Sequence, residues 1–342
     1  MVCIADQELA LAETVDTHWS FLPALCAIML LALVAPLSHA QPVQPVPERV
    51  ESVTLPTSAS DDASPVKPRN ASAAPRPYSI SIGYVPRDKS AAEIGAAPRP
   101  GTPRKIGFGR DIAELAGTTD TAARLQWQTT LQGGRIAALS ITSPLATGVR
   151  LGILVRRLPP EAILRFYRQG AGAAYEISGR EVLETVKRNL DAGDKSDEAR
   201  TFWSPYVEGE EATLEIELPM GIRHDTLEIA IPRVSHFFSS PLASPGGNIE
   251  KIGQSGSCEI DVSCYSDWSV ESNATAMMIF VASGSSFECS GTLLNDRASD
   301  LKPYFLSANH CISSQTAAST RCAGGTNCSP ATPMAEGRMP AR

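Results

Sequence analysis

His310 is the side chain best placed in this sequence to move a proton. It lies in the run Ser307–Cys311 (SANHC), directly after the apolar segment Pro303–Leu306. Cys289 precedes Cys311 by 22 positions, in a predicted strand that reads FECSGTLL. A disulfide between two neighbouring strands would pin the turn and the imidazole with it. An immobilised histidine with a pKa near neutrality suits a general base that takes a proton from a hydroxyl nucleophile.

These two strands resemble the first β-barrel of the trypsin-like (chymotrypsin-fold) serine proteases. In that family a strand of the form Cys-x-Gly-(Ser/Thr)-Leu is bridged to the cysteine that follows the catalytic histidine. The segment Ser255–Cys264 (SGSCEIDVSC) is similar to the start of the mature enzyme in the bacterial lysyl endopeptidase branch. The resemblance covers residues 255–320, and it implies an endopeptidase that cleaves after a basic side chain through an acyl-enzyme.

The resemblance assigns a role to each matching residue. His310 corresponds to the general base, and Cys289 and Cys311 correspond to the local disulfide. Cys258 and Cys264 correspond to cysteines that bridge to later parts of the domain. The resemblance implies no metal and no cofactor.

The sequence departs from the family after the histidine. The mechanism needs an Asp that orients His310 and a Ser that attacks the carbonyl, yet residues 311–342 contain no Asp and no Gly-x-Ser-Gly. Only 85 residues run from Cys258 to Arg342, whereas a closed β-barrel domain takes roughly 200–250. We therefore expect a truncated, catalytically incomplete protease segment at 258–320 and a non-homologous tail at 321–342. We also expect residues 258–342 to be poorly folded in isolation, because half a barrel leaves strand edges unpaired.

The first forty residues are typical of a targeting segment. Phe21–Leu37 is apolar, and the small residues Ser38 and Ala40 fit a signal-peptidase site that would expose Gln41. The first twenty residues carry no Lys or Arg, so a misplaced start or an N-terminal anchor remains the alternative to a cleaved signal. Export would permit disulfides, which agrees with six of the eight cysteines lying after residue 257.

The middle of the chain predicts a mainly β protein. Residues 41–104 hold twelve of the 26 prolines and indicate a disordered tether, with a short strand at Tyr78–Tyr84. Residues 105–245 alternate apolar and polar side chains, which favours a β-sandwich pro-domain with one helix near 179–190. The alternating sets include Leu125–Leu131, Val149–Val155, Leu214–Leu218 and Leu227–Ile231. A linker at 246–257 follows, and Lys251 in it is the expected maturation site.

Composition excludes some classes of function. Thirty basic and 37 acidic residues give a net charge of −7, which does not favour a nucleic-acid binder. Only one stretch is apolar enough to enter a bilayer, which excludes a membrane protein with several spans. The predicted partners are protein or peptide substrates of the complete enzyme. The alternative function is that of an exported β-sandwich module that binds or inhibits a paralogous protease.

Other readings of the polar residues remain open. His310, Cys311, Cys322 and Cys328 could bind zinc, although their spacing lacks a tight Cys-x-x-Cys pair and export favours disulfides. The acidic run at 191–198 could bind calcium, but a solvated loop fits it better. The remaining histidines, His39, His224 and His236, are interpreted as surface or loop residues.

Overall fold

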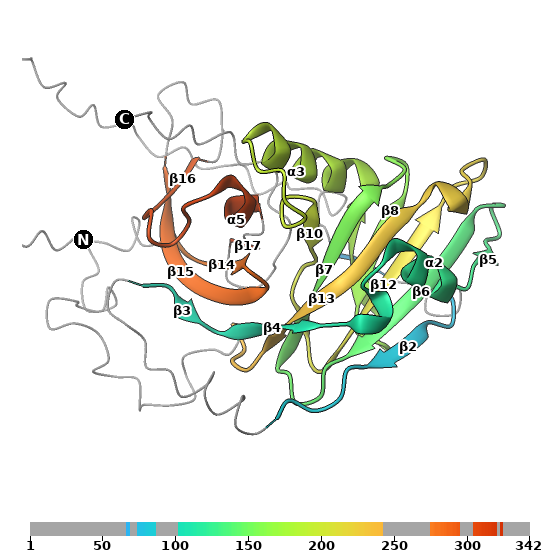
Figure 1. Ribbon diagram of the computed structural model, residues 1–342, viewed down its shortest axis with the longest axis horizontal. Helices are drawn as coiled ribbons and strands as arrows, with labels where there is room; N and C mark the ends of the chain where they lie inside the picture. Colours follow the sequence, from blue (N-terminus) through green and yellow to red (C-terminus); the bar gives the residue numbers. More distant parts are fainter. Residues whose placement is uncertain are drawn as a thin grey trace, which may run out of the picture. The chain divides into compact units, whose positions relative to one another are not determined.

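The computed structural model describes residues 66–68, 74–86, 102–241, 274–294, 304–319 and 322–323. The described chain is mainly β, as the sequence predicts, and its strands form three sheets (Figure 1). Within these ranges no helix is long and apolar enough to cross a bilayer. Cys258, Cys264, Cys328, Lys251 and the signal site at Ala40 lie outside the described residues.

The first sheet has seven strands. Its order is β1-β9-β8-β12-β6-β2, and β5 also pairs with β6. Every pairing is antiparallel except that of β2 with β6. The strands are β1 (Val66–Pro68), β2 (Tyr78–Ser81), β5 (Gln128–Thr129), β6 (Arg135–Thr142), β8 (Ile163–Tyr167), β9 (Ala173–Ser178) and β12 (Glu211–Leu218).

The second sheet faces the first across one hydrophobic core. Its order is β10-β7-β13-β4, with β11 paired to β7. The strands are β4 (Gly107–Asp111), β7 (Gly148–Arg157), β10 (Thr201–Trp203), β11 (Val207–Glu208) and β13 (Glu228–Phe237). Aliphatic side chains from both sheets meet in the core, among them Leu139, Leu151, Leu214 and Val234. The predicted β-sandwich is therefore present.

The central strand of the second sheet is buried on both faces. Val149, Leu151 and Ile153 of β7 point into the core and are fully buried, as the alternation predicts. The intervening Arg150 and Leu154 point the other way, yet they are only 2% and 8% exposed. The Arg150 guanidinium donates to the carbonyls of Ser204 and Trp203, at 2.6 and 3.4 Å, and Ser235, which lies opposite Arg150 in the ladder, contacts a further sheet.

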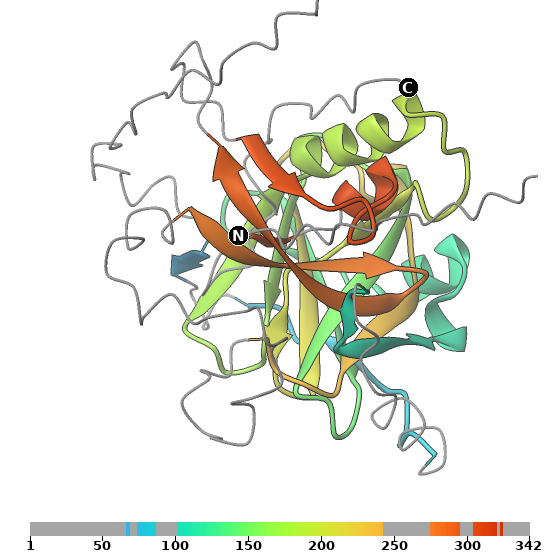
Figure 2. The same ribbon diagram turned by 90° about the vertical axis from the view of Figure 1, so that its left-hand side faces the viewer.

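The covering layer is the third sheet, seen face-on in Figure 2. Its order is β16-β15-β14-β17, and β3 also pairs with β15. The strands are β3 (Arg104–Lys105), β14 (Thr275–Ala282), β15 (Ser285–Leu294), β16 (Tyr304–Ser307) and β17 (Cys322–Ala323). A buried hydrogen bond of 2.7 Å joins the hydroxyls of Ser235 in β13 and Ser286 in β15.

Helix α3 (Gly179–Asp191) lies where the sequence predicts a helix. The Ser178 hydroxyl accepts from the Glu181 backbone amide, and the Glu181 carboxylate accepts from the Ser178 amide, which completes a capping box. Val182 and Val186 bury the apolar stripe of the helix. The short helices α2 (Thr118–Arg124) and α5 (Gln315–Ser319) and the 3-10 turns Ala113–Leu115 and His224–Thr226 complete the described elements.

Three expectations from the sequence need correction. The strand predicted at Leu125–Leu131 is reduced to the two residues of β5, because α2 ends at Arg124 and Leu131 lies in a turn, where it is 99% exposed. The stretch predicted as a disordered tether contributes β1, which was not predicted, as well as β2, which lies within the predicted strand Tyr78–Tyr84 and places Ile80 in the core. His236, interpreted as a surface residue, is 4% exposed.

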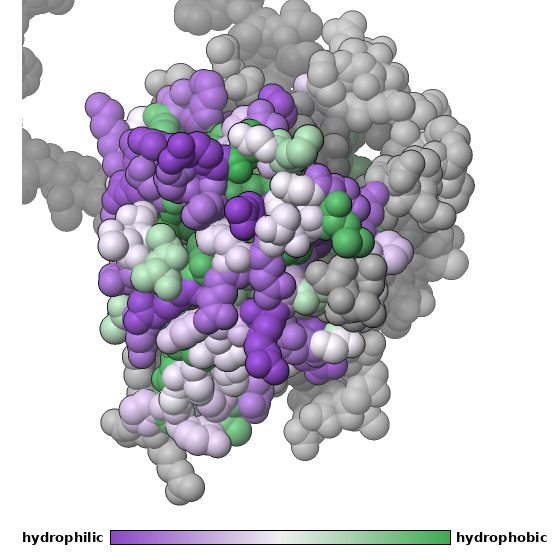
Figure 3. Space-filling view, turned by 90° about the vertical axis from the view of Figure 1, so that its right-hand side faces the viewer, coloured by the Kyte–Doolittle hydropathy of each residue, from purple (hydrophilic) through white to green (hydrophobic). Residues whose placement is uncertain are grey.

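Figure 3 shows the side of the molecule on which α2 and β5 lie. Its green, hydrophobic residues are scattered among purple ones and do not gather into one patch. Exposed apolar side chains that occur singly are normal for a protein surface. This side of the sandwich therefore gives no indication of a protein-binding face.

Candidate functional site: the His310 turn

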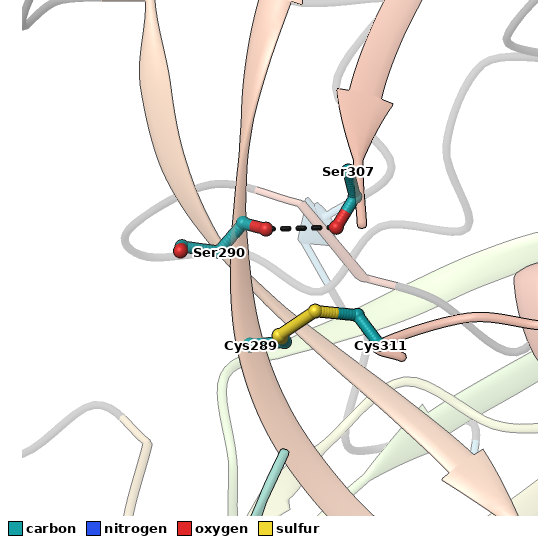
Figure 4. The surroundings of a disulfide bond; sticks show 4 residues. All are labelled: Cys289, Ser290, Ser307 and Cys311. Carbon is teal, nitrogen blue, oxygen red and sulfur yellow. Dashed lines mark hydrogen bonds between the residues drawn. A yellow bond between two sulfur atoms is a disulfide. The ribbon is translucent and has the colours of Figure 1, made fainter. Parts of the chain in front are cut away.

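The His310 turn is built where β16 leaves the third sheet. Ser307 ends β16 opposite Gly291 of β15, and its hydroxyl donates to the Ser290 carbonyl oxygen at 2.8 Å (Figure 4). The chain then folds back on itself, because the backbone amides of Cys311 and Ile312 both donate to the Ala308 carbonyl, at 3.0 and 3.3 Å. His310 lies exposed in this turn.

A disulfide fixes the turn to the neighbouring strand. Cys289 of β15 and Cys311 are bonded, with their Cα atoms 6.0 Å apart (Figure 4). Cys311 is 6% exposed, so the bond lies under the turn while the imidazole remains accessible to solvent. The disulfide that the family resemblance implies is thus present. It gives His310 a covalent anchor one residue away, which is the arrangement expected for a positioned base.

Of the residues in the zinc alternative, His310 and Cys311 meet Cys289 here, whereas Cys328 lies outside the described residues. The ring nitrogens of His310 and the sulfurs of Cys289 and Cys311 lie within 4.8 Å of one another, close enough to suggest a metal site. However, the two sulfurs are bonded to each other. Zinc binds cysteine as thiolate, so this pair offers no anionic sulfur while the bond is intact.

Helix α5 connects the turn to the sandwich. The Thr316 hydroxyl donates to the Asp194 carboxylate at 2.6 Å, and Ser196 donates to the same carboxylate through its hydroxyl and its backbone amide. These donors lower the pKa of Asp194. Sequence reasoning missed this contact because the two residues lie 122 positions apart.

The same contacts argue against the calcium alternative. Asp194 is occupied by Ser196 and Thr316, and both oxygens of Asp197 accept from Arg156, at 2.8 and 2.9 Å. Burial raises the pKa of Glu198, which marks its carboxylate as poorly hydrated. The carboxylates of this loop mainly tie protein segments together.

Two comparisons identify relatives of this chain. The family profile described as the lysyl endopeptidase N-terminal domain matches residues 85–238, and the profile described as the lysyl endopeptidase C-terminal domain matches residues 252–331. The second match continues past residue 320, where the sequence predicts the non-homologous tail to begin.

A protein from Pseudomonas aeruginosa, described as "Lysyl endopeptidase", is 32% identical over 309 residues. The aligned region covers 86% of this chain and 62% of that protein, so the chain spans less than two thirds of the length of its relative. No solved structure matches the chain.

Proposed function

Because the chain belongs to the lysyl endopeptidase family, we propose that it is the precursor of a secreted serine endopeptidase that cleaves after Lys or Arg. In this proposal residues 1–40 are a signal peptide removed after Ala40, and residues 41–104 lead into a pro-domain at 105–245. Maturation cuts the linker after Lys251 and frees the start of the catalytic domain, in which Cys258 and Cys264 bridge to later cysteines.

His310 is the proposed general base. It would accept the proton of a serine hydroxyl as that oxygen attacks the peptide carbonyl, and return it to the leaving amine. The observation that carries this proposal is the Cys289–Cys311 bond, which holds the exposed imidazole beside β15. The matches to both lysyl endopeptidase domains support the same reaction class.

The printed residues do not supply the whole mechanism. From Cys311 to Arg342 they include no Asp to orient His310 and no Gly-x-Ser-Gly around a nucleophile. We therefore expect the 342-residue chain to leave Lys and Arg peptide substrates intact and to resist a serine-directed phosphonate probe. Labelling by the probe would contradict this expectation.

The test of the protease assignment begins with the nucleotide sequence beyond codon 320. We expect one reading frame to continue the barrel and to encode an Asp and a Gly-x-Ser-Gly. The extended product should cleave after Lys or Arg, and His310→Ala should lower kcat/KM by about 10⁴-fold or more. His224→Ala is the matched control, because His224 is an exposed histidine of the sandwich whose ring lies tilted beside that of Trp127. Equal activity of both variants would refute the assignment.

A second function is favoured by the contact between the second and third sheets. The sandwich buries Ser235 and Phe237 of β13 against Ser286 and Ile279. A sandwich released by maturation would therefore retain a surface that fits a protease segment of this type. We expect the added chain to lower the activity of a related lysyl endopeptidase in a stoichiometric titration, and an unchanged rate would exclude this role.

A further inference from the structure

One extended segment of the chain forms the edge of two sheets. Residues 107–111 (β4) pair with β13 of the sandwich, whereas residues 104–105 (β3) pair with β15 of the protease segment (Figure 1). Ile106 is the crossing point. Its amide donates to the Ser286 carbonyl at 2.9 Å, and its own carbonyl accepts from the Phe238 amide at 3.1 Å.

The crossing point is also anchored by apolar packing. Ile106 is 1% exposed and forms a small cluster with Tyr206, Phe237 and Ile279. Tyr206 and Phe237 belong to the sandwich, and Ile279 belongs to β14. A strand of two residues would be weak alone, but here it continues directly from a buried anchor.

Strand β3 occupies the same edge of β15 as β16. The other edge of β15 is taken by β14, which pairs with residues 285–292. Strand β16 pairs with residues 291–294, and β3 pairs with Phe287 and Glu288. The two strands therefore lie end to end along one edge, and only Cys289 and Ser290 separate their pairing sites.

This gap faces the candidate catalytic turn. Cys289 carries the disulfide to Cys311, and Ser290 receives the hydrogen bond from Ser307. Strand β3 consequently ends one residue from the cysteine that anchors His310. An incoming peptide that added a strand to β15 next to His310 would need the edge that β3 fills.

An ion pair selects the segment that fills the edge. Arg104 lies opposite Glu288 in the ladder, and the guanidinium contacts the Glu288 carboxylate. The Glu288 side chain is 18% exposed, so this pair is partly shielded from water. Opposite charges directly across a strand pair stabilise the pairing, and like charges oppose it.

We infer that Arg104–Ile106 is an autoinhibitory strand latch, which occupies the Phe287–Glu288 edge of β15 and must leave before another extended basic peptide can pair beside His310. This inference deepens the proposed function, because it assigns to the pro-domain a specific blocking contact. Charge recognition between Arg104 and Glu288 sets which segment the edge accepts.

The test uses the 342-residue chain with Arg104→Glu, Glu288→Arg and the double variant. In hydrogen exchange, each single variant should speed exchange of the Ser286 and Glu288 amides, which face β3, by about tenfold, because it replaces an attraction with a repulsion. The double variant should restore protection. Arg157→Glu is the control of equal charge change, since Arg157 pairs with Glu228 on the exposed surface of the sandwich.

A peptide probe tests whether the edge is a receptor. A labelled, end-blocked peptide of residues 102–108 (TPRKIGF) should raise its fluorescence anisotropy with the Arg104→Glu chain. It should bind the wild-type chain at least tenfold more weakly, because the latch fills the edge there, and it should fail to bind the double variant.

The latch is refuted if the single variants leave exchange at Ser286 and Glu288 unchanged, if the double variant does not restore protection, or if the peptide binds wild type and Arg104→Glu equally. None of these readouts requires peptide hydrolysis. Failure of the latch is therefore distinguishable from failure of the protease assignment, which the extended product tests.

Discussion

The sandwich and the third sheet differ in what covers their apolar side chains. The sandwich encloses its core between two sheets of its own, and Leu139, Phe166 and Leu214 are completely buried there. The third sheet is a single layer. Ile279, which is 4% exposed, packs against Phe237 and Tyr206 of the sandwich. The sandwich carries the elements of an independent fold, whereas the third sheet borrows part of its core.

Because of this difference, the third sheet depends on the sandwich that precedes it in the chain. A partial barrel alone would expose strand edges and apolar surface. Here β3 covers an edge of β15, and the outer face of the second sheet covers the layer itself. We therefore still expect residues 258–342 to fold poorly in isolation. Within the whole chain, the sandwich covers strand edges and apolar surface that they would otherwise expose.

The largest expected effect concerns the direction of this dependence. Phe166→Ala should cost the sandwich about 3–5 kcal/mol of unfolding free energy and should also remove exchange protection from β14 and β15. Ile279→Ala should reduce protection in β14 and β15 and leave β6 and β12 unchanged. Hydrogen exchange of both variants measures this asymmetry. Equal losses in all four strands after Ile279→Ala would show that the two regions unfold as one unit.

The next effect tests whether the outer face of the sandwich is stabilised on its own. Arg165 pairs with Glu176, Glu215 and Glu217 at 2.8, 3.0 and 2.7 Å. Burial lowers the pKa of Arg165, but the three carboxylates together outweigh that effect and raise it. Arg165→Ala should cost about 3 kcal/mol in a denaturant titration, since it strands the Glu215 carboxylate, which is 4% exposed.

Arg156→Ala is the matched comparison for Arg165→Ala. Arg156 pairs with Asp197 in solvent, so its loss should cost less than about 1 kcal/mol. Equal costs for the two variants would contradict the assigned role of burial.

Acid should weaken the sandwich through His236. Burial, and secondarily the positive charge of Arg110, lower the pKa of His236 to about 4, and Glu210 opposes this shift. The Arg110 guanidinium donates to the Ser143 hydroxyl at 2.9 Å, and that hydroxyl lies 2.7 Å from Nδ1 of His236. Because the Ser143 oxygen accepts from Arg110, its own proton is directed at Nδ1 of His236. A ring nitrogen that accepts a hydrogen bond carries no proton, so this arrangement favours the neutral imidazole.

The sign of the pH dependence follows from these pKa values. The unfolded histidine binds a proton near pH 6.5, before the folded one does, so stability is full above pH 6.5 and falls between pH 6.5 and 4. The loss at pH 4.5 should be roughly 2.5 kcal/mol. His236→Gln should remove this component from denaturant titrations at pH 7.5 and 4.5, whereas His224→Gln should leave it in place. An unchanged pH profile in His236→Gln would contradict the assignment.

The smallest effect probes the hydrogen bond between the two regions. Ser286→Ala should cost about 1–2 kcal/mol of local stability in the third sheet, because it leaves the Ser235 hydroxyl buried without this partner. The double variant Ser235→Ala with Ser286→Ala should recover much of that loss. Exchange rates in β15 measure both. A double variant that is as unstable as the sum of the single variants would indicate that the hydroxyls act separately.

Local patterns predicted much of the fold. The capping box at Ser178 located α3, and strict alternation at Val149–Val155 located β7. The same alternation could not show that Arg150, on the other face of β7, is buried, since its partners Trp203 and Ser204 lie 53 and 54 residues later. Leu131 misled the prediction because its apolar type fits a strand, whereas residues 131–133 form an exposed turn.

The candidate site was predictable only in part. The motifs around Cys289 and Cys311 identified the disulfide and the turn with His310. Two contacts join segments that are distant in the sequence: Thr316 with Asp194, and Arg104 with Glu288. No local spacing of residues predicts them.

The turn between β14 and β15 carries a consequence for evolution. Gly284 has a φ of +77°, and a Cβ at this position would lie 2.4 Å from Cδ of Arg233 in β13. A side chain at position 284 of the third sheet therefore requires the Arg233 side chain of the sandwich to move. The two regions are therefore not interchangeable parts. A chimera that joins this sandwich to the protease segment of a relative should tolerate a larger residue at position 284 only when position 233 becomes smaller as well.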